Sequence, residues 1–330
     1  MNKEAQRSHS YSLEHSSQLP TTIAESVAQI KTLALQEFDR EIVQKQLYYH
    51  TREHVNNVQR RANQIFLAVS PYWIAAQQQQ PTLDIPRMKL LLDLCAAAHD
   101  MVQVFVVSTQ AHTCRQRKPG VSETATIERL LKYINELNEQ LQLDAPTSPA
   151  RLTLEDITII RDAIAATICV YDPTEQAIYQ QSLYEPNKSL SPVARILALA
   201  DIGSLGIDGV NVYRQEGSLL FLEENLDVIP LILDGTIYTL GSDNSELYQN
   251  VQQRLLSRCR FQVNFAKSRV ARLEREVADF PEPAIPTLTH EVFKYLNPTK
   301  IQEIEATTPT HEDATLEVLL EFFEFERYLN

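Results

Sequence analysis

The most informative shortage in this sequence is glycine. Only 7 of the 330 residues are glycine, whereas 44% of the residues are hydrophobic. Sheet architectures usually need glycine in their turns, and the long segments of this chain are rich in Leu, Ala, Gln and Glu, most of which are strong helix formers. The composition therefore disfavours sheet-based folds and predicts an all-α protein that is long enough to bury a substantial core.

Cysteine pairs and long apolar runs are also missing. The 4 cysteines lie far apart and form no Cys-x-x-Cys pair, so we expect reduced thiols and a cytoplasmic protein. No segment reaches the roughly 18 consecutive apolar residues that a membrane helix needs. Residues 1–22 are polar and lack the apolar stretch of a signal peptide, so we expect a disordered N-terminal arm there.

Basic residues are outnumbered by acidic ones. The chain has 30 Lys and Arg against 43 Asp and Glu, which gives a formal net charge of -13. Such a charge repels phosphate backbones and anionic lipid, so we expect no binding to nucleic acid or membranes. A small anionic substrate is still compatible, because a metal ion reverses the local field. We interpret the basic face within residues 251–270 as solvated surface or a partner helix rather than a ligand site.

Hydrophobic periodicity and turn residues divide the chain into helices and connections. We expect helices over residues 23–44, 51–66, 87–98, 122–141, 153–168, 192–199 and 221–277. Ser122 and Thr153 are candidate helix caps, with Ser148 as an alternative to Thr153. A polar loop is expected over 75–86, and a second loop over 103–120 is expected to lie over the site.

Prolines set the predicted domain boundary. Residues 23–280 predict one helical domain, and Pro281, Pro283 and Pro286 mark a linker. The remainder of 281–330 contains an acidic amphipathic helix. This C-terminal extension could dock on the body of the same chain or on a second subunit, as in a homodimer.

Four residues that can bind a metal are spread along the chain. His50 and His54 are four positions apart, so on a helix they share one face, and one of them can bind the metal while the other faces the substrate. His99 and Asp100 are adjacent at the end of an apolar helix, and Asp201 would come from another helix. Taken singly, each is usually a surface or capping residue. Together, two imidazoles and two carboxylates could hold one divalent metal and leave positions open for water.

These residues occur in motifs that resemble the HD-domain metal-dependent phosphohydrolases, a family named for the pair that His99-Asp100 matches. The resemblance covers roughly residues 47–226 and is strongest around three segments: 49–58, 96–100 and 199–204. The Tyr-His-x-x-x-His opening also resembles the cyclic-nucleotide phosphodiesterases, which share the helical fold. The resemblance therefore implies an HD-type helical bundle and hydrolysis of a phosphoester.

The resemblance also implies a role for each motif residue. The metal would be held by four residues: His54, His99, Asp100 and Asp201. His50 would donate a proton to the leaving oxygen, and Asp100 would help to take the proton of the attacking water. The predicted function is a metal-dependent phosphohydrolase that cleaves a phosphoester or phosphoanhydride of a small nucleotide-like substrate.

Several positions depart from the pattern of the family. Thr51 stands where Asn is frequent, and Glu123 lies in Ser-Glu-Thr where many members have Asn-Glu-Ser. Cys169 follows Thr167-Ile168 where related proteins often carry a His after a Thr, which removes a polar group from the expected pocket. The missing histidine near Cys169, the atypical loop over 103–120 and the acidic C-terminal extension favour the alternative, a catalytically weak HD-fold regulatory or ligand-binding module.

The number of histidines predicts a single metal ion. His112 is the only histidine between Asp100 and Asp201, whereas the dinuclear enzymes of this fold, including the di-iron oxygenases, need two more in that interval. A metal oxygenase is therefore disfavoured. Mixed nitrogen and carboxylate ligands suit Mn, Fe, Co, Ni or Zn, and imidazole makes Mg less favoured.

Four further residues are candidates for binding the substrate. Arg52, Arg117 and Lys118 could neutralise phosphate charge, although each is also compatible with an ordinary surface cation. Glu123 could orient water or a ligand hydroxyl, or it could simply stabilise the first turn of its helix.

Overall fold

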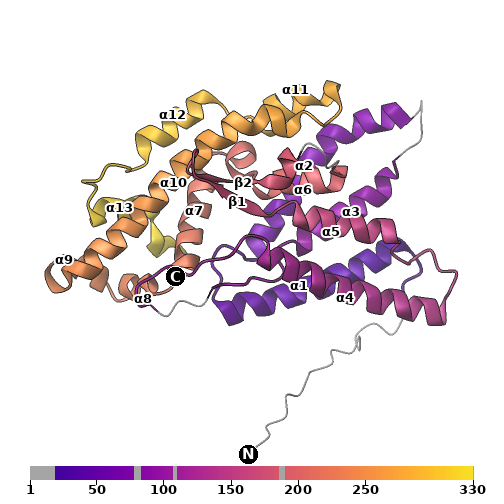
Figure 1. Ribbon diagram of the computed structural model, residues 1–330, viewed down its shortest axis with the longest axis horizontal. Coiled ribbons are helices and arrows are strands. Elements are labelled where there is room, and N and C mark those ends of the chain that lie inside the picture. Colours follow the sequence, from indigo (N-terminus) through magenta and orange to yellow (C-terminus); the bar gives the residue numbers. More distant parts are fainter. Residues whose placement is uncertain (1–18, 78–82, 107–109, 186–189, 330) are drawn as a thin grey trace, which may run out of the picture.

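The computed structural model describes residues 19–77, 83–106, 110–185 and 190–329, and these are mostly helical (Figure 1). The first half holds α1 (Ile23–Lys45), α2 (Arg52–Gln77), α3 (Ile85–Ala98), α4 (Val121–Asp144), α5 (Leu154–Ala165) and α6 (Pro192–Asp201). The second half holds α7 (Val210–Glu224), α8 (Val228–Leu233), α9 (Leu240–Asp243), α10 (Ser245–Val277), α11 (Ile285–Thr287), α12 (Pro298–Thr307) and α13 (Leu316–Phe323). In the described part of the chain, the only sheet is an antiparallel hairpin of β1 (Cys169–Asp172) and β2 (Ala177–Gln180). The all-α prediction is confirmed.

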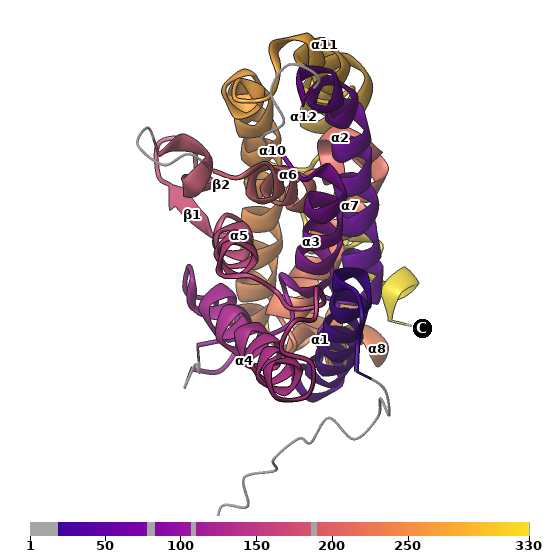
Figure 2. The same cartoon turned by 90° about the vertical axis from the view of Figure 1, so that its right-hand side faces the viewer.

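Helix α3 lies at the centre of the first half, in contact with α1, α2, α5 and α6 (Figure 2). Leu91, Leu94, Cys95 and Ala98 on this helix are almost completely buried. A helix that is apolar on nearly every side must lie inside the bundle, as its sequence predicts. The C-terminal end of α3 therefore delivers the residues that follow it to the interior of the protein.

Of the two helix caps predicted from the sequence, one is present in the structure and one is not. Thr153 caps α5 as predicted, because its hydroxyl accepts the backbone N–H of Asp156 and the Asp156 carboxylate accepts the backbone N–H of Thr153. The predicted cap at Ser122 is wrong. Helix α4 begins one residue earlier, after Gly120, whose φ of 79° suits glycine. The hydroxyl of Ser122 instead accepts the backbone N–H of Val104 and holds the preceding loop against α4.

One predicted helix ends earlier than expected, and another is interrupted. The helix predicted over 153–168 stops at Ala165, and the chain then enters the β1–β2 hairpin. The helix predicted over 221–277 is interrupted between Glu224 and Ser245 by α8, a 3-10 turn and α9. Gly235, with a φ of 76°, turns the chain within this interruption, and the Asn244 side chain caps the start of α10.

The C-terminal extension packs on the body of the same chain. Helix α13 contacts α7 and α10, and Leu319 and Phe323 are buried in a second apolar core with α8 and the first half of α10. This core lies at the α8–α9–α13 end of the molecule in Figure 1. The segment predicted as a linker forms short helical turns, and its residues Leu288 and Phe293 are completely buried. It therefore belongs to the main core.

Some predictions fall outside the described residues. Most of the expected arm over 1–22 does so, as does 78–82 within the expected loop over 75–86.

Helix α2 continues to Gln77, well beyond its predicted end. In the described ranges, no helix combines the length and the apolar character that crossing a membrane requires.

Candidate metal centre

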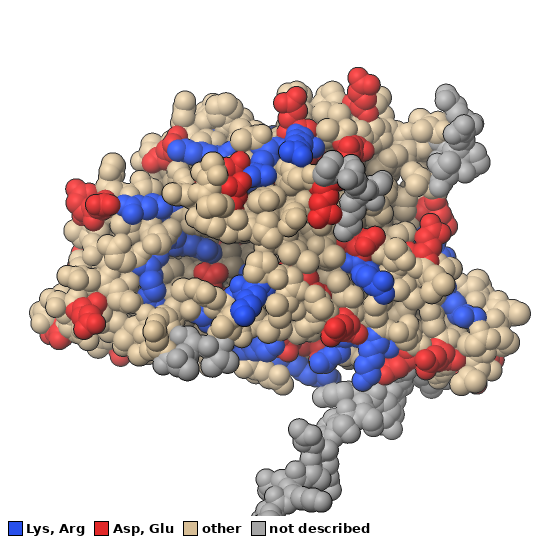
Figure 3. Space-filling view, in the orientation of Figure 1, with Lys and Arg blue, Asp and Glu red and all other residues tan. Residues whose placement is uncertain are grey.

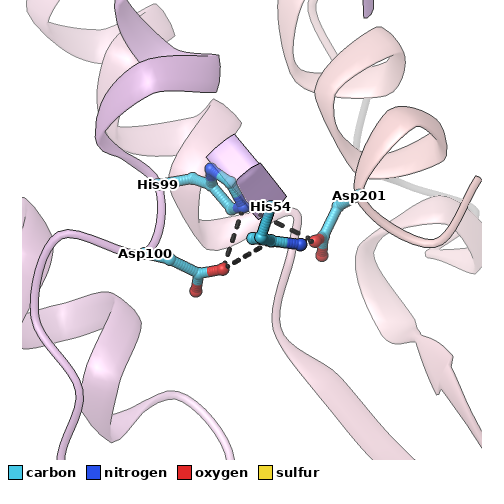
Figure 4. A group of neighbouring side chains, drawn as sticks. All are labelled: His54, His99, Asp100 and Asp201. Carbon is cyan, nitrogen blue, oxygen red and sulfur yellow. Dashed lines mark hydrogen bonds and ion pairs between the residues drawn. The ribbon is translucent and has the colours of Figure 1, made fainter. Parts of the chain in front are cut away.

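The four predicted metal ligands converge from three helices. His54 projects from the first turn of α2, His99 and Asp100 follow the end of α3, and Asp201 is the last residue of α6 (Figure 4). One ligand atom from each residue can be chosen so that all four lie within 4.8 Å of one another. Helix ends place these groups well, because each side chain leaves a rigid element close to the same interior point.

The separations fit a single bound ion. The Oδ2 atom of Asp100 lies 3.1 Å from Nε2 of His54 and 3.0 Å from Nε2 of His99. The Oδ1 atom of Asp201 lies 3.8 Å and 3.5 Å from the same two nitrogens. Ligands bound at about 2.1 Å to one ion lie roughly 3.0 to 3.4 Å apart when adjacent and roughly 4.2 Å apart when opposite. The cluster could therefore hold a metal ion with little movement.

The hydrogen bonding of His99 prepares it as a ligand. Its Nδ1 atom lies 3.1 Å from the carbonyl oxygen of Ala96 and donates to it, which places the ring proton on Nδ1 and leaves the lone pair on Nε2. The Nε2 atom is buried and faces two carboxylates, 3.0 Å from Oδ2 of Asp100 and 3.5 Å from Oδ1 of Asp201. Burial lowers the pKa of His99, but Asp100 and Asp201 raise it well above its usual value, so the two carboxylates favour a positive charge at this point, which a bound cation would also supply.

Two glutamines fix the carboxylates of the cluster. Gln103 donates from Nε2 to Oδ1 of Asp100 at 3.1 Å, and Gln180 donates from Nε2 to Oδ2 of Asp201 at 3.2 Å. Both glutamines are completely buried. Each bond leaves the other carboxylate oxygen free to face the ion. Sequence reasoning missed both residues, because a single glutamine at the end of a strand or in a loop carries no recognisable signal.

His50 lies beside the cluster and is held by Glu223, a residue of α7. The Nδ1 atom of His50 is 2.5 Å from Oε1 of Glu223. The Oε2 atom of Glu223 accepts the backbone N–H groups of Tyr48, Tyr49 and His50 at 2.9 to 3.0 Å. Burial alone would raise the pKa of Glu223, but the His50 ring, the His50 backbone N–H and the charge of Arg117 lower it to about 2. Glu223 is therefore an ionised acceptor that orients His50.

The other ring nitrogen of His50 faces the candidate ligand set. His50 Nε2 is 3.7 Å from Oδ2 of Asp100 and accepts a hydrogen bond from Nη1 of Arg117 at 2.9 Å. Arg117 also donates to Oε1 of Gln103 at 2.8 Å. Burial opposes the charge on this guanidinium, but Asp100 and Glu223 nevertheless raise its pKa, so Arg117 stays cationic. A fixed positive charge therefore lies next to the cluster.

A cavity of about 470 Å³ opens onto these groups. This volume lies in the range of small-molecule binding sites. Three of the four residues predicted to bind substrate line it: Arg117, Lys118 and Glu123. The structure does not bring the fourth to this cavity, because the guanidinium of Arg52 forms an ion pair with Asp39 at 2.6 Å on the exterior. Nothing in the sequence around Arg52 indicates that its side chain points away from the face of α2 that carries His54.

The predicted loop over the site also lies at this cavity. Arg117, Lys118 and Pro119 come from its end and line the cavity, as do residues of α7. Within the loop, Val106 forms an isolated β-bridge with Gln116, and residues 107–109 lie outside the described part of the chain. The loop therefore contributes directly to the predicted binding surface.

Cys169, which stands where related proteins often carry a His, lies at the cavity as expected. Thr167 and Cys169 both line its wall. Burial raises the pKa of the Cys169 thiol, and the Asp201 carboxylate raises it further, so the side chain is a neutral thiol.

His112 does not provide a second metal site. It lies against Asp227 with 3.4 Å between Nδ1 and Oδ2, and the described His, Cys, Asp and Glu residues form no other cluster of this kind. The cluster thus matches one ion rather than two.

Searches of this chain against protein-family models, curated proteins and solved structures find no match.

Proposed function

We propose that this chain is a metal-dependent phosphohydrolase of the HD type that acts on a small nucleotide-like phosphoester or phosphoanhydride. The observation that carries the proposal is the convergence of four ligand atoms within 4.8 Å beside a histidine that its own carboxylate orients. The His-Asp pair at the end of α3 and the order of the ligands along the helices are the features that support an HD-like arrangement.

The metal would be held by His54, His99, Asp100 and Asp201, with the two glutamines orienting the carboxylates. A divalent ion in such a site supplies Lewis acidity and lowers the pKa of water to near neutrality. Imidazole ligands favour Mn, Fe, Co, Ni or Zn over Mg. Asp100 would also help to take the proton of the attacking water.

His50 would protonate the leaving oxygen. Because Glu223 accepts the Nδ1–H bond, the ring can carry a second proton on Nε2 with its charge balanced by an ionised partner. In the structure Nε2 accepts a bond from Arg117 instead. A phosphate group at the centre would draw the Arg117 guanidinium to its own oxygens and release Nε2 for this role.

The remaining predicted groups would recognise the phosphate and its substituent. Arg117 and Lys118 supply two cations that line the cavity. Burial raises the pKa of Glu123, so this side chain could accept or donate a hydrogen bond to a ligand hydroxyl. The net negative charge of the chain favours a small substrate over a nucleic-acid polymer.

A turnover screen tests the proposal. The purified chain is loaded in turn with Mn, Fe, Co, Ni and Zn and assayed on nucleotides and p-nitrophenyl phosphoesters. We expect hydrolysis with at least one ion, and we expect the His50→Gln variant to keep its metal and lose 10²- to 10⁴-fold of kcat, roughly the contribution of a general acid.

The same screen separates the rival function. A chain that binds one ion fully but hydrolyses none of these esters would be a ligand-binding or regulatory module. If the wild-type chain binds nucleotides but hydrolyses none of the esters, the result supports that alternative and refutes the hydrolase.

A further inference from the structure

The cavity at the metal centre continues into a second groove along α10. Tyr171, Glu224, Arg258 and Phe261 line both spaces. The space-filling view shows a hollow on this face, bordered by basic side chains (Figure 3). A substrate bound at the metal would therefore have a direct path into the groove.

One row of α10 side chains runs from the groove to the cavity. Asn250 and Arg254 line the groove, Arg258 lines both spaces, and Gln262 lines the cavity. These residues follow one another at intervals of four, so they share a helix face over a length of about 18 Å. A mononucleotide at the metal would cover only the near end of this row.

The same four side chains carry buried polar atoms that no described residue satisfies. Gln262 is the clearest case, because it is 3% exposed and neither its Oε1 nor its Nε2 has a partner. Leaving a buried polar group unpaired costs about 1 to 3 kcal/mol. These atoms are enclosed by the protein, so the groups that a ligand in the groove would reach are the exposed carboxamides of Gln249 and Gln253 beside the row.

The charges in the groove are already neutralised. Arg254 binds Asp227 through two hydrogen bonds of 2.9 Å, Arg258 is 3.7 Å from Glu224, and Arg260 is 3.8 Å from Glu312. The groove therefore does not offer a second phosphate site. The uncharged groups that line it include carboxamides and aromatic rings: Gln249, Asn250, Gln253, Tyr171 and Phe261, of which Phe261 also stacks on Phe265.

Carboxamides and rings suit an uncharged heterocycle. A carboxamide both donates and accepts hydrogen bonds, as the edge of a nucleobase requires, and a ring provides a stacking face. A sugar would use the carboxamides but gain less from the rings. The combination therefore favours a nucleoside in the groove.

We propose that the substrate is a linear phosphodiester of dinucleotide size, with its phosphate at the metal centre and one nucleoside lying along α10 in the groove. This inference rests on the proposed hydrolase function. Hydrolysis breaks the P–O bond to that nucleoside and forms a P–O bond to the oxygen of water. The departing nucleoside oxygen takes a proton from His50, and the other nucleoside keeps the phosphate as a monoester.

Three esters test the substrate assignment on the manganese-loaded full chain. They are a linear dinucleoside monophosphate, a diester with a sugar in place of the second nucleoside, and methyl p-nitrophenyl phosphate, whose arms are too short for the groove. We expect the lowest KM for the dinucleotide. An equal KM for the sugar diester would overturn the assignment of a nucleoside.

Groove variants test the location. In Asn250→Ala/Gln253→Ala we expect the KM for the dinucleotide to rise about tenfold, as two lost hydrogen bonds predict, with the methyl ester unchanged. Gln140→Ala, on an exposed position of α4, is the matched control and should change neither. Equal effects on both esters, or no effect on either, would overturn the inference. Hydrolysis of the methyl ester alone would overturn only this inference, whereas no hydrolysis of any ester would remove the proposed function as well.

Discussion

At the scale of single residues, the candidate centre depends on groups that form hydrogen bonds to the candidate ligands and to His50 and so fix their orientation. Gln180 holds Asp201 and Gln103 holds Asp100, so each carboxylate presents one oxygen to the cluster. Glu223 does the same for His50. The sequence predicted the four ligands and His50 from short motifs, but Glu223 lies 173 positions from His50, and no local pattern links them. Only the path of α7 through the fold brings the pair together.

Removing the amide that orients Asp201 should weaken metal binding. We expect Gln180→Leu to lower metal affinity about 10- to 100-fold, because outer hydrogen bonds fix the orientation of a ligand. Titration of the metal-free protein with Zn or Mn measures the change by calorimetry. Unaltered affinity would mean that Asp201 is positioned by its backbone alone.

Removing the charge behind His50 should affect catalysis rather than metal content. For Glu223→Gln we expect at least a tenfold lower kcat, because the imidazolium loses its balancing carboxylate. Metal analysis of the same preparation is the control and should show the wild-type content. If the variant retains full turnover on the best ester found in the screen, Glu223 has no part in proton donation.

At the scale of elements, the helices were predictable where one face or the whole surface is apolar. The bounds of α1 and α3 follow their periodicity within a few residues, and Thr153 is a local signal that held. The sequence failed where distant contacts decide the conformation. Ser122 resembles a cap but bonds to Val104, and the prolines after 280 resemble a linker although the residues around them enter the main core.

The contact between α3 and α5 should make stability depend on pH. Burial would raise the pKa of Asp156, but hydrogen bonds from Arg87 and Thr153 lower it below 3.8. A carboxyl with a lowered folded pKa stabilises the fold above its unfolded pKa, and this contribution disappears as the pH falls below about 4. We expect Asp156→Asn to lower the free energy of unfolding by about 2 kcal/mol at pH 7.

Thermal or urea unfolding at a series of pH values measures this effect. The difference between wild type and Asp156→Asn should shrink as the pH falls below 3.8. A difference that stays constant down to pH 2.5 would show that the carboxylate charge does not contribute.

The docking of α13 offers a matched pair of substitutions. Phe323 is 1% exposed and stacks on Phe221 and Phe325, whereas Val318 on the same helix is 47% exposed. We expect Phe323→Ala to cost about 3 to 5 kcal/mol and Val318→Ala less than about 0.5 kcal/mol. Chemical denaturation measures both. Similar losses for the two variants would contradict the packing of α13 on the body.

At the scale of the whole molecule, three helix ends in one bundle meet at one point, and α7 and α10 close the cavity beside it. The spacing of the motifs indicated a bundle with inward-facing ligands, which agrees with the placement of all four. The basic face of α10 was interpreted as solvated surface or a partner helix, yet Arg258 lines the cavity and Arg269 is buried against Glu276. Charge alone did not reveal which of these side chains the fold would cover.

The central claim is that four distant side chains bind one metal ion, and metal content tests it most directly. Elemental analysis of the protein after saturation with Mn or Zn and removal of free ion should give one ion per chain in wild type and in Gln140→Ala. It should give far less than one in His99→Ala and in Asp201→Ala. Wild-type protein without bound metal, or ligand variants that keep a full ion, would contradict the account.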